Sequence, residues 1–192
     1  VEGNITISKI EAGNLISVAT GVTFNLAGKG TNWLILDGNG FTQNGALIST
    51  AGTVKVQYVV LTNNVSSGNG GAIILLNNSK NSTFENCKIT NNKAQNGSAL
   101  FGDYASASAT FSTTIISDNI STKDGILAFK CNISLISCEI KNNKSQNGII
   151  KNYAGGILNT NNCIITQNTA EIGAGLHIDG YTNIKYSQIS NN

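Results

Sequence analysis

Residues 84–100 read FENCKITNNKAQNGSAL, and residues 135–150 read LISCEIKNNKSQNGII. The two stretches carry a Cys, an Ile, an Asn-Asn pair, a Lys, a Gln-Asn and a Gly in the same order, 51 residues apart. A phrase that recurs at a fixed distance is typical of a repeat protein, in which each repeat is one structural unit stacked on its neighbour. The fold therefore depends on the length of this unit.

The second Asn of the pair recurs every 24–28 residues. The recurring positions are Asn39, Asn64, Asn92, Asn119, Asn143, Asn168 and Asn192. A large aliphatic residue always lies three residues before this Asn, an apolar or small residue lies five before it, and the residue between them varies. This alternation predicts a short strand with one buried face.

Two more apolar runs accompany each of these strands, and a Gly follows the Asn by five or six residues in every repeat but the last. We predict an all-β, right-handed parallel β-helix of about seven to eight coils, each of 24–28 residues with three short strands. Residues 1–30 are less regular and are expected to form a first coil or a cap, with the repeats spanning 31–192. The chain starts at Val1 and stops inside the repeated phrase, so we expect an excerpt that is truncated at its C-terminal end.

The recurring asparagines are predicted to form a structural ladder. Equivalent residues of neighbouring coils lie about 4.8 Å apart, and an Asn amide both donates and accepts hydrogen bonds. All seven recurring asparagines are expected to stack in one column inside a turn.

Residues 61–73 read LTNNVSSGNGGAI, which resembles the GGAI-type repeats of chlamydial polymorphic membrane proteins. It is similar also to the Asn-rich, β-helical adhesin-like surface proteins of methanogenic archaea. The resemblance implies an exported cell-surface protein with an adhesive or structural role, and it supplies no catalytic residues. These repeats also resemble the broad pectin-lyase-like class, which includes polysaccharide lyases and hydrolases.

Composition restricts the partners. Charged residues make up 11% of the chain, the net charge is +2, and all twelve basic residues are Lys. Without a basic cluster, no nucleic-acid binding is expected. No apolar stretch is long enough to cross a membrane, so this segment is expected to make no membrane contact. No cofactor is expected.

Catalytic residues are not expected. Asp103 and Asp179 share a column but lie about 14 Å apart over three coils, beyond the roughly 5–9.5 Å of a two-carboxylate glycosidase site. His177 stands beside Asp179 without a nucleophile or a third partner.

The cysteines are expected to be structural and not to bind a metal. Cys87, Cys138 and Cys163 share an inward column and are expected to be buried thiols, and no CxxC-like cluster predicts a metal site. Cys138 and Cys163 lie on successive coils, where a disulfide is the alternative.

Two kinds of residue are candidates for contact with sugars. Trp33 and Tyr58 share a column on consecutive coils and are the candidate glycan-binding residues, because together they could form a flat aromatic platform. The alternative is that they pack beneath the N-terminal segment. Of the N-x-S/T sequons, those at Asn4, Asn77, Asn81 and Asn132 lie outside the ladder and are the candidates for N-glycosylation.

The resemblance to GGAI-type repeats implies an extracellular or cell-surface, adhesin-like rod whose partners are glycans or proteins of a cell surface. Two alternatives stay open: a carbohydrate-active enzyme of the pectin-lyase-like class, and a structural protein that assembles end to end through an exposed strand edge.

Overall fold

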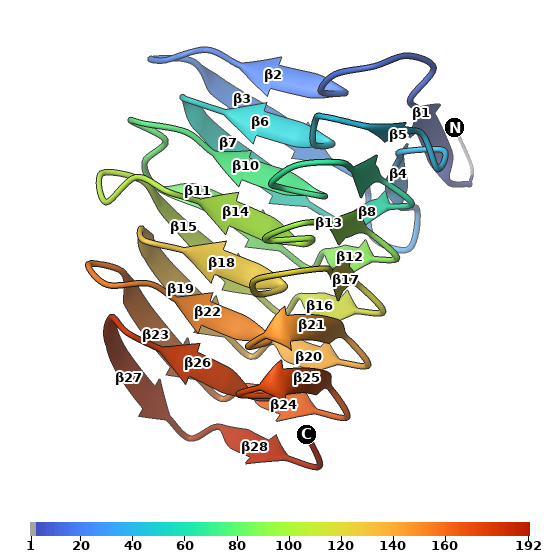
Figure 1. Ribbon diagram of the computed structural model, residues 1–192. Helices are drawn as coiled ribbons and strands as arrows, with labels where there is room; N and C mark the ends of the chain where they lie inside the picture. Colours follow the sequence, from blue (N-terminus) through green and yellow to red (C-terminus); the bar gives the residue numbers. More distant parts are fainter. Residues whose placement is uncertain (1–2) are drawn as a thin grey trace.

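The computed structural model describes residues 3–192 as a stack of coils that runs in order from the N-terminal end, at the top of Figure 1, to the C-terminal end at the bottom. All strand pairings between neighbouring coils are parallel, and residues 3–192 contain no helix. The predicted all-β, right-handed parallel β-helix is confirmed, with about seven coils.

Four parallel sheets run along the stack, and we number them 1 to 4. Sheet 1 contains β1 (Ile5–Ser8), β4 (Leu34–Asp37), β8 (Val59–Thr62), β12 (Lys88–Thr90), β16 (Ile115–Ser117), β20 (Glu139–Lys141), β24 (Ile164–Thr166) and β28 (Gln188–Ser190). Sheet 2 contains β2 (Ile16–Val18), β6 (Ile48–Thr50), β10 (Ile73–Leu75), β14 (Leu100–Gly102), β18 (Leu127–Phe129), β22 (Ile150–Asn152) and β26 (Leu176–Ile178). Sheet 3 contains β3 (Thr23–Ala27), β7 (Thr53–Gln57), β11 (Ser82–Glu85), β15 (Ser108–Ser112), β19 (Asn132–Ile136), β23 (Ile157–Asn161) and β27 (Tyr181–Lys185). Sheet 4 contains β5 (Thr42–Gln43), β9 (Val65–Ser66), β13 (Lys93–Ala94), β17 (Ile120–Ser121), β21 (Lys144–Asn147) and β25 (Thr169–Ile172).

The prediction of three strands per coil is wrong, because sheet 4 supplies a fourth. Its strands follow the recurring Asn of every coil except the last and are only two to four residues long. A strand of two residues, such as β13, is too short to show a period of two, so it carries no alternating pattern that the sequence could reveal.

The core consists of columns of apolar side chains that stack from coil to coil. The aliphatic column of sheet 1 is buried in every coil from Leu36 to Ile165, as the alternation predicts. Phe84 and Phe111 stack with their rings nearly parallel and their centroids 4.8 Å apart. The interior is therefore continuous along the solenoid, and each coil depends on its two neighbours for burial.

The glycine column marks a turn that other residues rarely adopt. The glycines that precede sheet 2 have positive φ angles, for example 71° at Gly70 and 62° at Gly97. At the following position, a Cβ on Gly71 would lie 2.2 Å from the carbonyl oxygen of Ser98. The two glycines of the GGAI sequence are therefore needed for different reasons: Gly70 adopts a left-handed backbone conformation, and Gly71 lies against the backbone of the next coil.

The asparagine ladder is present from Asn64 onward. From Asn92 to Asn192, Oδ1 of each ladder Asn accepts the backbone N–H of the ladder Asn in the preceding coil, at 2.9–3.1 Å. From Asn92 to Asn168, the Nδ2 group of each also donates to the next Oδ1 and to two carbonyl oxygens. The amides thus satisfy buried backbone groups at every turn.

Asn39 does not belong to this ladder, and its predicted place there is wrong. Gly38 lies against Asn64, and Asn39 takes the exposed, left-handed position that Asn63 takes in the next coil, with φ angles of 55° and 56°. The N-terminal end of the ladder is closed instead by Lys9, which is 2% exposed and whose Nζ donates to Asn64 Oδ1 at 3.1 Å.

Residues 5–27 supply β1, β2 and β3, the outermost strands of three of the sheets. The division of the chain at residue 30 remains a prediction.

Candidate functional site

Trp33, the only tryptophan of the chain, lies directly before β4 at the N-terminal end of the solenoid. Its backbone N–H donates to Oδ1 of Asn4 at 2.7 Å, and its carbonyl accepts the N–H of Ile5. The N-terminal segment therefore holds the Trp33 backbone, while the indole stays half-exposed.

Trp33 and Tyr58 are neighbours, but they do not form the flat platform that the sequence predicted. Their ring centroids are 6.1 Å apart and their planes meet at 75°, in an edge-to-face contact. The reason is that Tyr58 has a left-handed backbone with a φ of 53°, whereas Trp33 does not. The two side chains therefore leave their strands in different directions. Nζ of Lys88 lies 4.7 Å from the Trp33 ring centroid, a cation–π contact that covers one face of the indole.

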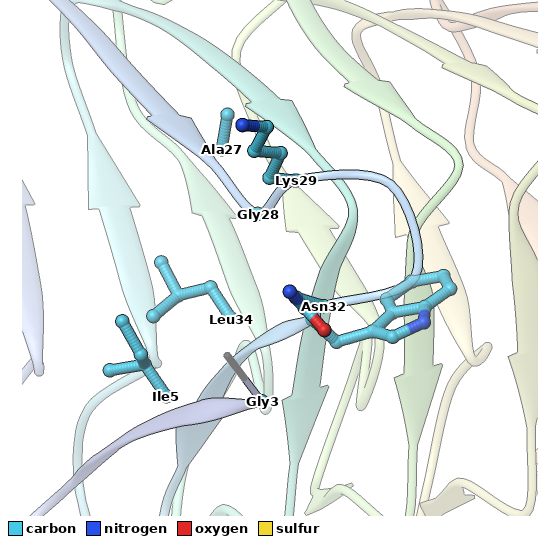
Figure 2. Close-up of a pocket in the computed structure, with 8 residues that line it drawn as sticks. Gly3, Ile5, Ala27, Gly28, Lys29, Asn32 and Leu34 are labelled. Carbon is cyan, nitrogen blue, oxygen red and sulfur yellow. The ribbon is translucent and has the colours of Figure 1, made fainter. Parts of the chain in front are cut away.

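A depression of about 250 Å³ opens beside Trp33. It is lined by Gly3, Ile5, Ala27, Gly28, Lys29, Asn32, Trp33 and Leu34. Figure 2 shows Ile5 and Leu34 side by side as an apolar wall, with Asn32 and Lys29 on the other side of the opening.

A second depression of about 480 Å³ shares Ala27 with the first and continues over sheet 3. It is lined by Asn25, Leu26, Ala27, Lys55, Gln57, Thr83 and Glu85. We call the two together the Trp33 groove. In it, Nε2 of Gln57 donates to Glu85 Oε2 at 2.6 Å, which orients an amide and a carboxylate from neighbouring coils.

The groove offers apolar surface and polar groups in close proximity. Its lysines, Lys29 and Lys55, together with Lys88 over the indole, outnumber its single carboxylate, Glu85. Ligand sites commonly combine an apolar wall with a few polar groups that fix orientation. This arrangement can bind a ring with an apolar face and hydroxyl or acidic substituents.

The four sequon asparagines are placed as follows. Asn77, Asn81 and Asn132 are exposed, and Oδ1 of Asn77 accepts a hydrogen bond from Ser106. Oδ1 of Asn4 is engaged by Trp33. Their glycosylation remains a prediction.

A cluster of charged residues on the outside of sheet 2 was missed by sequence reasoning. Lys151, whose side chain is 8% exposed, pairs with Asp179 at 2.6 Å, and its Nζ lies 5.5 Å from the ring centroid of Tyr153. The Tyr153 hydroxyl donates to Asp124 Oδ2 at 2.7 Å, and Asn147 donates to the other oxygen of Asp124. Burial and the bond to Asp124 raise the pKa of Tyr153, so its hydroxyl stays protonated at neutral pH.

Other carboxylates near this cluster are paired with lysines. Asp103 pairs with Lys130 at 2.9 Å, and Asp179 pairs with Lys151. Nε2 of His177 lies 3.8 Å from Asp179, and its Nδ1 is buried without a hydrogen-bond partner. The bond from Lys151 lowers the pKa of Asp179.

All four cysteines are buried, free thiols. The Cys138–Cys163 disulfide is therefore not formed in this structure, and its formation remains a prediction. Among residues 3–192, no three His, Cys, Asp or Glu side chains converge in a way that could hold a metal ion. The same residues include no helix that is able to cross a membrane.

The parallel sheets, stacked core and internal ladder define the class of the protein as a parallel β-helix. The family described as "Right handed beta helix region" matches residues 3–192, and the chain belongs to this family. Neither the curated proteins nor the solved structures include a match to this chain.

Proposed function

We propose that this chain is a segment of an adhesin-like rod at the cell surface and that it binds extracellular polysaccharide in the Trp33 groove. The observation that carries the proposal is the half-exposed indole at the edge of one depression, which shares Ala27 with a second, both with mixed polar and apolar linings. The stacked coils provide a stiff support on which this groove is displayed.

The chemistry of the groove favours a sugar. Pyranose rings present C–H groups that pack on an indole or on aliphatic side chains, such as those of Ile5 and Leu34. Their hydroxyl groups are bound by amides and carboxylates, which Asn32, Gln57 and Glu85 provide. A ligand that spans both depressions would contact several residues of neighbouring coils, which suits a chain of sugars.

The charge balance favours an acidic polysaccharide. Three lysines lie in or over the groove against one carboxylate, and Gln57 already donates a hydrogen bond to that carboxylate. A uronate or sulfate group would be attracted to these ammonium groups.

The extracellular or surface location rests on the likeness to GGAI-type repeats and on the exposed sequons at Asn77, Asn81 and Asn132. A rod with few charged residues and an uninterrupted core is suited to hold a binding site away from a cell. Glycans or proteins of another surface would be its partners.

The test is retention on a panel of insoluble neutral and acidic polysaccharides. Trp33→Ala is expected to lose retention, whereas Tyr186→Ala keeps it, because Tyr186 is an 88% exposed aromatic residue in the last coil, far from the groove. Circular dichroism and urea unfolding establish that both variants fold. Retention that survives Trp33→Ala, or no retention of the wild type on any acidic or neutral polysaccharide, would contradict the proposal.

A second candidate function is that of a carbohydrate-active enzyme, favoured by the cluster around Lys151. In that function the Tyr153 oxygen would take a proton from the sugar as its own proton passes to Asp124, the glycosidic C–O bond would break with the leaving oxygen protonated by water, and Lys151 would attract an acidic sugar. The test is release of new reducing or unsaturated sugar ends from the same polysaccharides by the wild type, but not by Tyr153→Phe. Without such release by the wild type, this function is excluded for the substrates used.

A further inference from the structure

Cys138 and Cys163 occupy one column on successive coils, directly before β20 and β24. The N–H of Ile164 donates to the carbonyl of Cys138 at 2.9 Å, which fixes the two coils in register at this point. Neighbouring strands lie about 4.7–4.9 Å apart, and disulfide-bonded cysteines have Cα separations of about 4.4–6.8 Å. The backbone spacing between the two coils is therefore compatible with a disulfide.

The two thiols also interact with each other. A hydrogen bond from Cys138 lowers the pKa of Cys163, and the same bond together with burial raises the pKa of Cys138. The shared hydrogen bond thus makes Cys163 the more acidic thiol of the pair and Cys138 the one that keeps its proton.

A surface depression of about 580 Å³ lies over this pair. It is lined by Ser137, Cys138, Glu139, Asn162, Cys163, Ile164, Tyr186 and Gln188. Both cysteines are only 1–2% exposed and belong to the buried core, so a reagent would have to displace the side chains that line the depression to reach them.

Cys87 is a natural comparison for Cys163. Both are buried in the same column, and each Sγ contacts the carbonyl oxygen two residues before it, at 3.3 Å in Cys87 and 3.4 Å in Cys163. The neighbour of Cys87 in the next coil is Thr114, however, so Cys87 has no second thiol, and burial raises its pKa to about 11. Reactivity that depends on the thiol pair should be absent there.

We infer that Cys138 and Cys163 form a thiol–disulfide exchange site that reacts with low-molecular-weight disulfides. The Cys163 thiolate attacks one sulfur of the disulfide, forms a mixed disulfide and releases a small thiolate, which takes up a proton. Cys138 then loses its proton, attacks the Cys163 sulfur and expels the second small thiol. The two cysteines are oxidised by two electrons, the small disulfide is reduced to two thiols, and a covalent bond joins neighbouring coils.

The test is incubation of the folded protein with glutathione disulfide, followed by intact mass measurement and peptide mapping. The wild type is expected to lose two hydrogen atoms without retaining glutathione, and the bond should map to Cys138 and Cys163. Cys138→Ser should stop at one glutathione on Cys163, whereas Cys163→Ser should gain neither modification. Because Cys131 and Cys138 lie between the same two lysines, Lys130 and Lys141, tandem fragmentation must distinguish them.

The control variant is Cys87→Ser, which should form the bridge at the wild-type rate. Circular dichroism and urea unfolding are measured for every variant, so that exposure of thiols by misfolding is detected. Modification of Cys87 as fast as that of Cys163, or no reaction of Cys163 in the folded wild type, would overturn the inference.

Discussion

Asn119 lies one coil beyond Asn92, and its Oδ1 accepts both the backbone N–H of Asn92 at 2.9 Å and its Nδ2–H at 3.1 Å. Its own Nδ2 donates to the carbonyl oxygens of Ile89 and Ser117. One side chain thus satisfies donors and acceptors in its own and in the preceding coil, all inside the solenoid.

Asn119→Ala is therefore expected to lower the free energy of unfolding by roughly 2–5 kcal/mol, because it leaves several buried polar groups without partners. Asn132→Ala is the matched control: Asn132 is exposed, and its loss should change stability by less than about 0.5 kcal/mol. Urea unfolding followed by circular dichroism measures both. Equal, small effects of the two substitutions would show that the ladder does not stabilise the stack.

Tyr153→Phe tests the cluster on sheet 2. The substitution removes the hydrogen bond to Asp124, while Asn147 still donates to that carboxylate. Since the site is partly exposed, we expect a loss of about 1 kcal/mol in the free energy of unfolding. Tyr104→Phe, at a tyrosine that is 45% exposed, should have no effect; similar losses in both variants would contradict the structural role of the Asp124 contact.

The cysteines predict a pH-dependent reactivity. A thiol with a lowered pKa is a thiolate at a lower pH, so Cys163 should be alkylated by iodoacetamide well below the ordinary thiol pKa of 9.0. The pKa values of Cys87 and Cys131 are raised by burial to about 11 and 12, so their alkylation should still be increasing above pH 9. Peptide mapping of the folded protein across pH 5–10 measures all of these rates. A common pH profile would contradict the hydrogen bond between the paired thiols.

Most of the fold can be predicted from the sequence, because a solenoid repeats the same side chain at the same place. Ile89 and Ile116 are separated by one coil in the sequence and adjoin in the structure, so the column of buried residues can be read directly. Asn39 was misplaced because a glycine, Gly38, lies against Asn64 in the turn and leaves Asn39 in the exposed, left-handed position. Such a local shift keeps the spacing almost unchanged and is invisible in the sequence.

The candidate sites were less predictable for a different reason. The column that pairs Trp33 with Tyr58 was evident, but the angle between the rings depends on the left-handed backbone of Tyr58, which nothing in the residue type indicates. Asp124 and Tyr153 come from different parts of their coils, so their contact crosses columns. Column alignment detects neighbours along the stack and misses contacts between its corners.

The charges of the Trp33 groove predict a dependence on salt. Binding of an acidic polysaccharide should weaken as sodium chloride is raised, because exposed charges are screened beyond about 10 Å at 0.1 M salt. Lys55→Ala should weaken binding by up to roughly fivefold, the equivalent of one exposed ion pair. Lys185→Ala, at an exposed lysine of the last coil of the same sheet, is the control. Equal effects of the two lysines would indicate attraction to the whole surface and not to the groove.

The most direct measurement of the central claim uses the fluorescence of Trp33, which as the only tryptophan reports on the groove alone. Soluble fragments of a retained polysaccharide are titrated into the folded wild type while the indole emission is recorded. We predict a saturable change in emission whose midpoint agrees with the affinity measured by calorimetry, and the same change in Tyr186→Ala. Binding that is detected by calorimetry but leaves the emission of Trp33 unchanged would place the polysaccharide elsewhere on the rod and contradict the account.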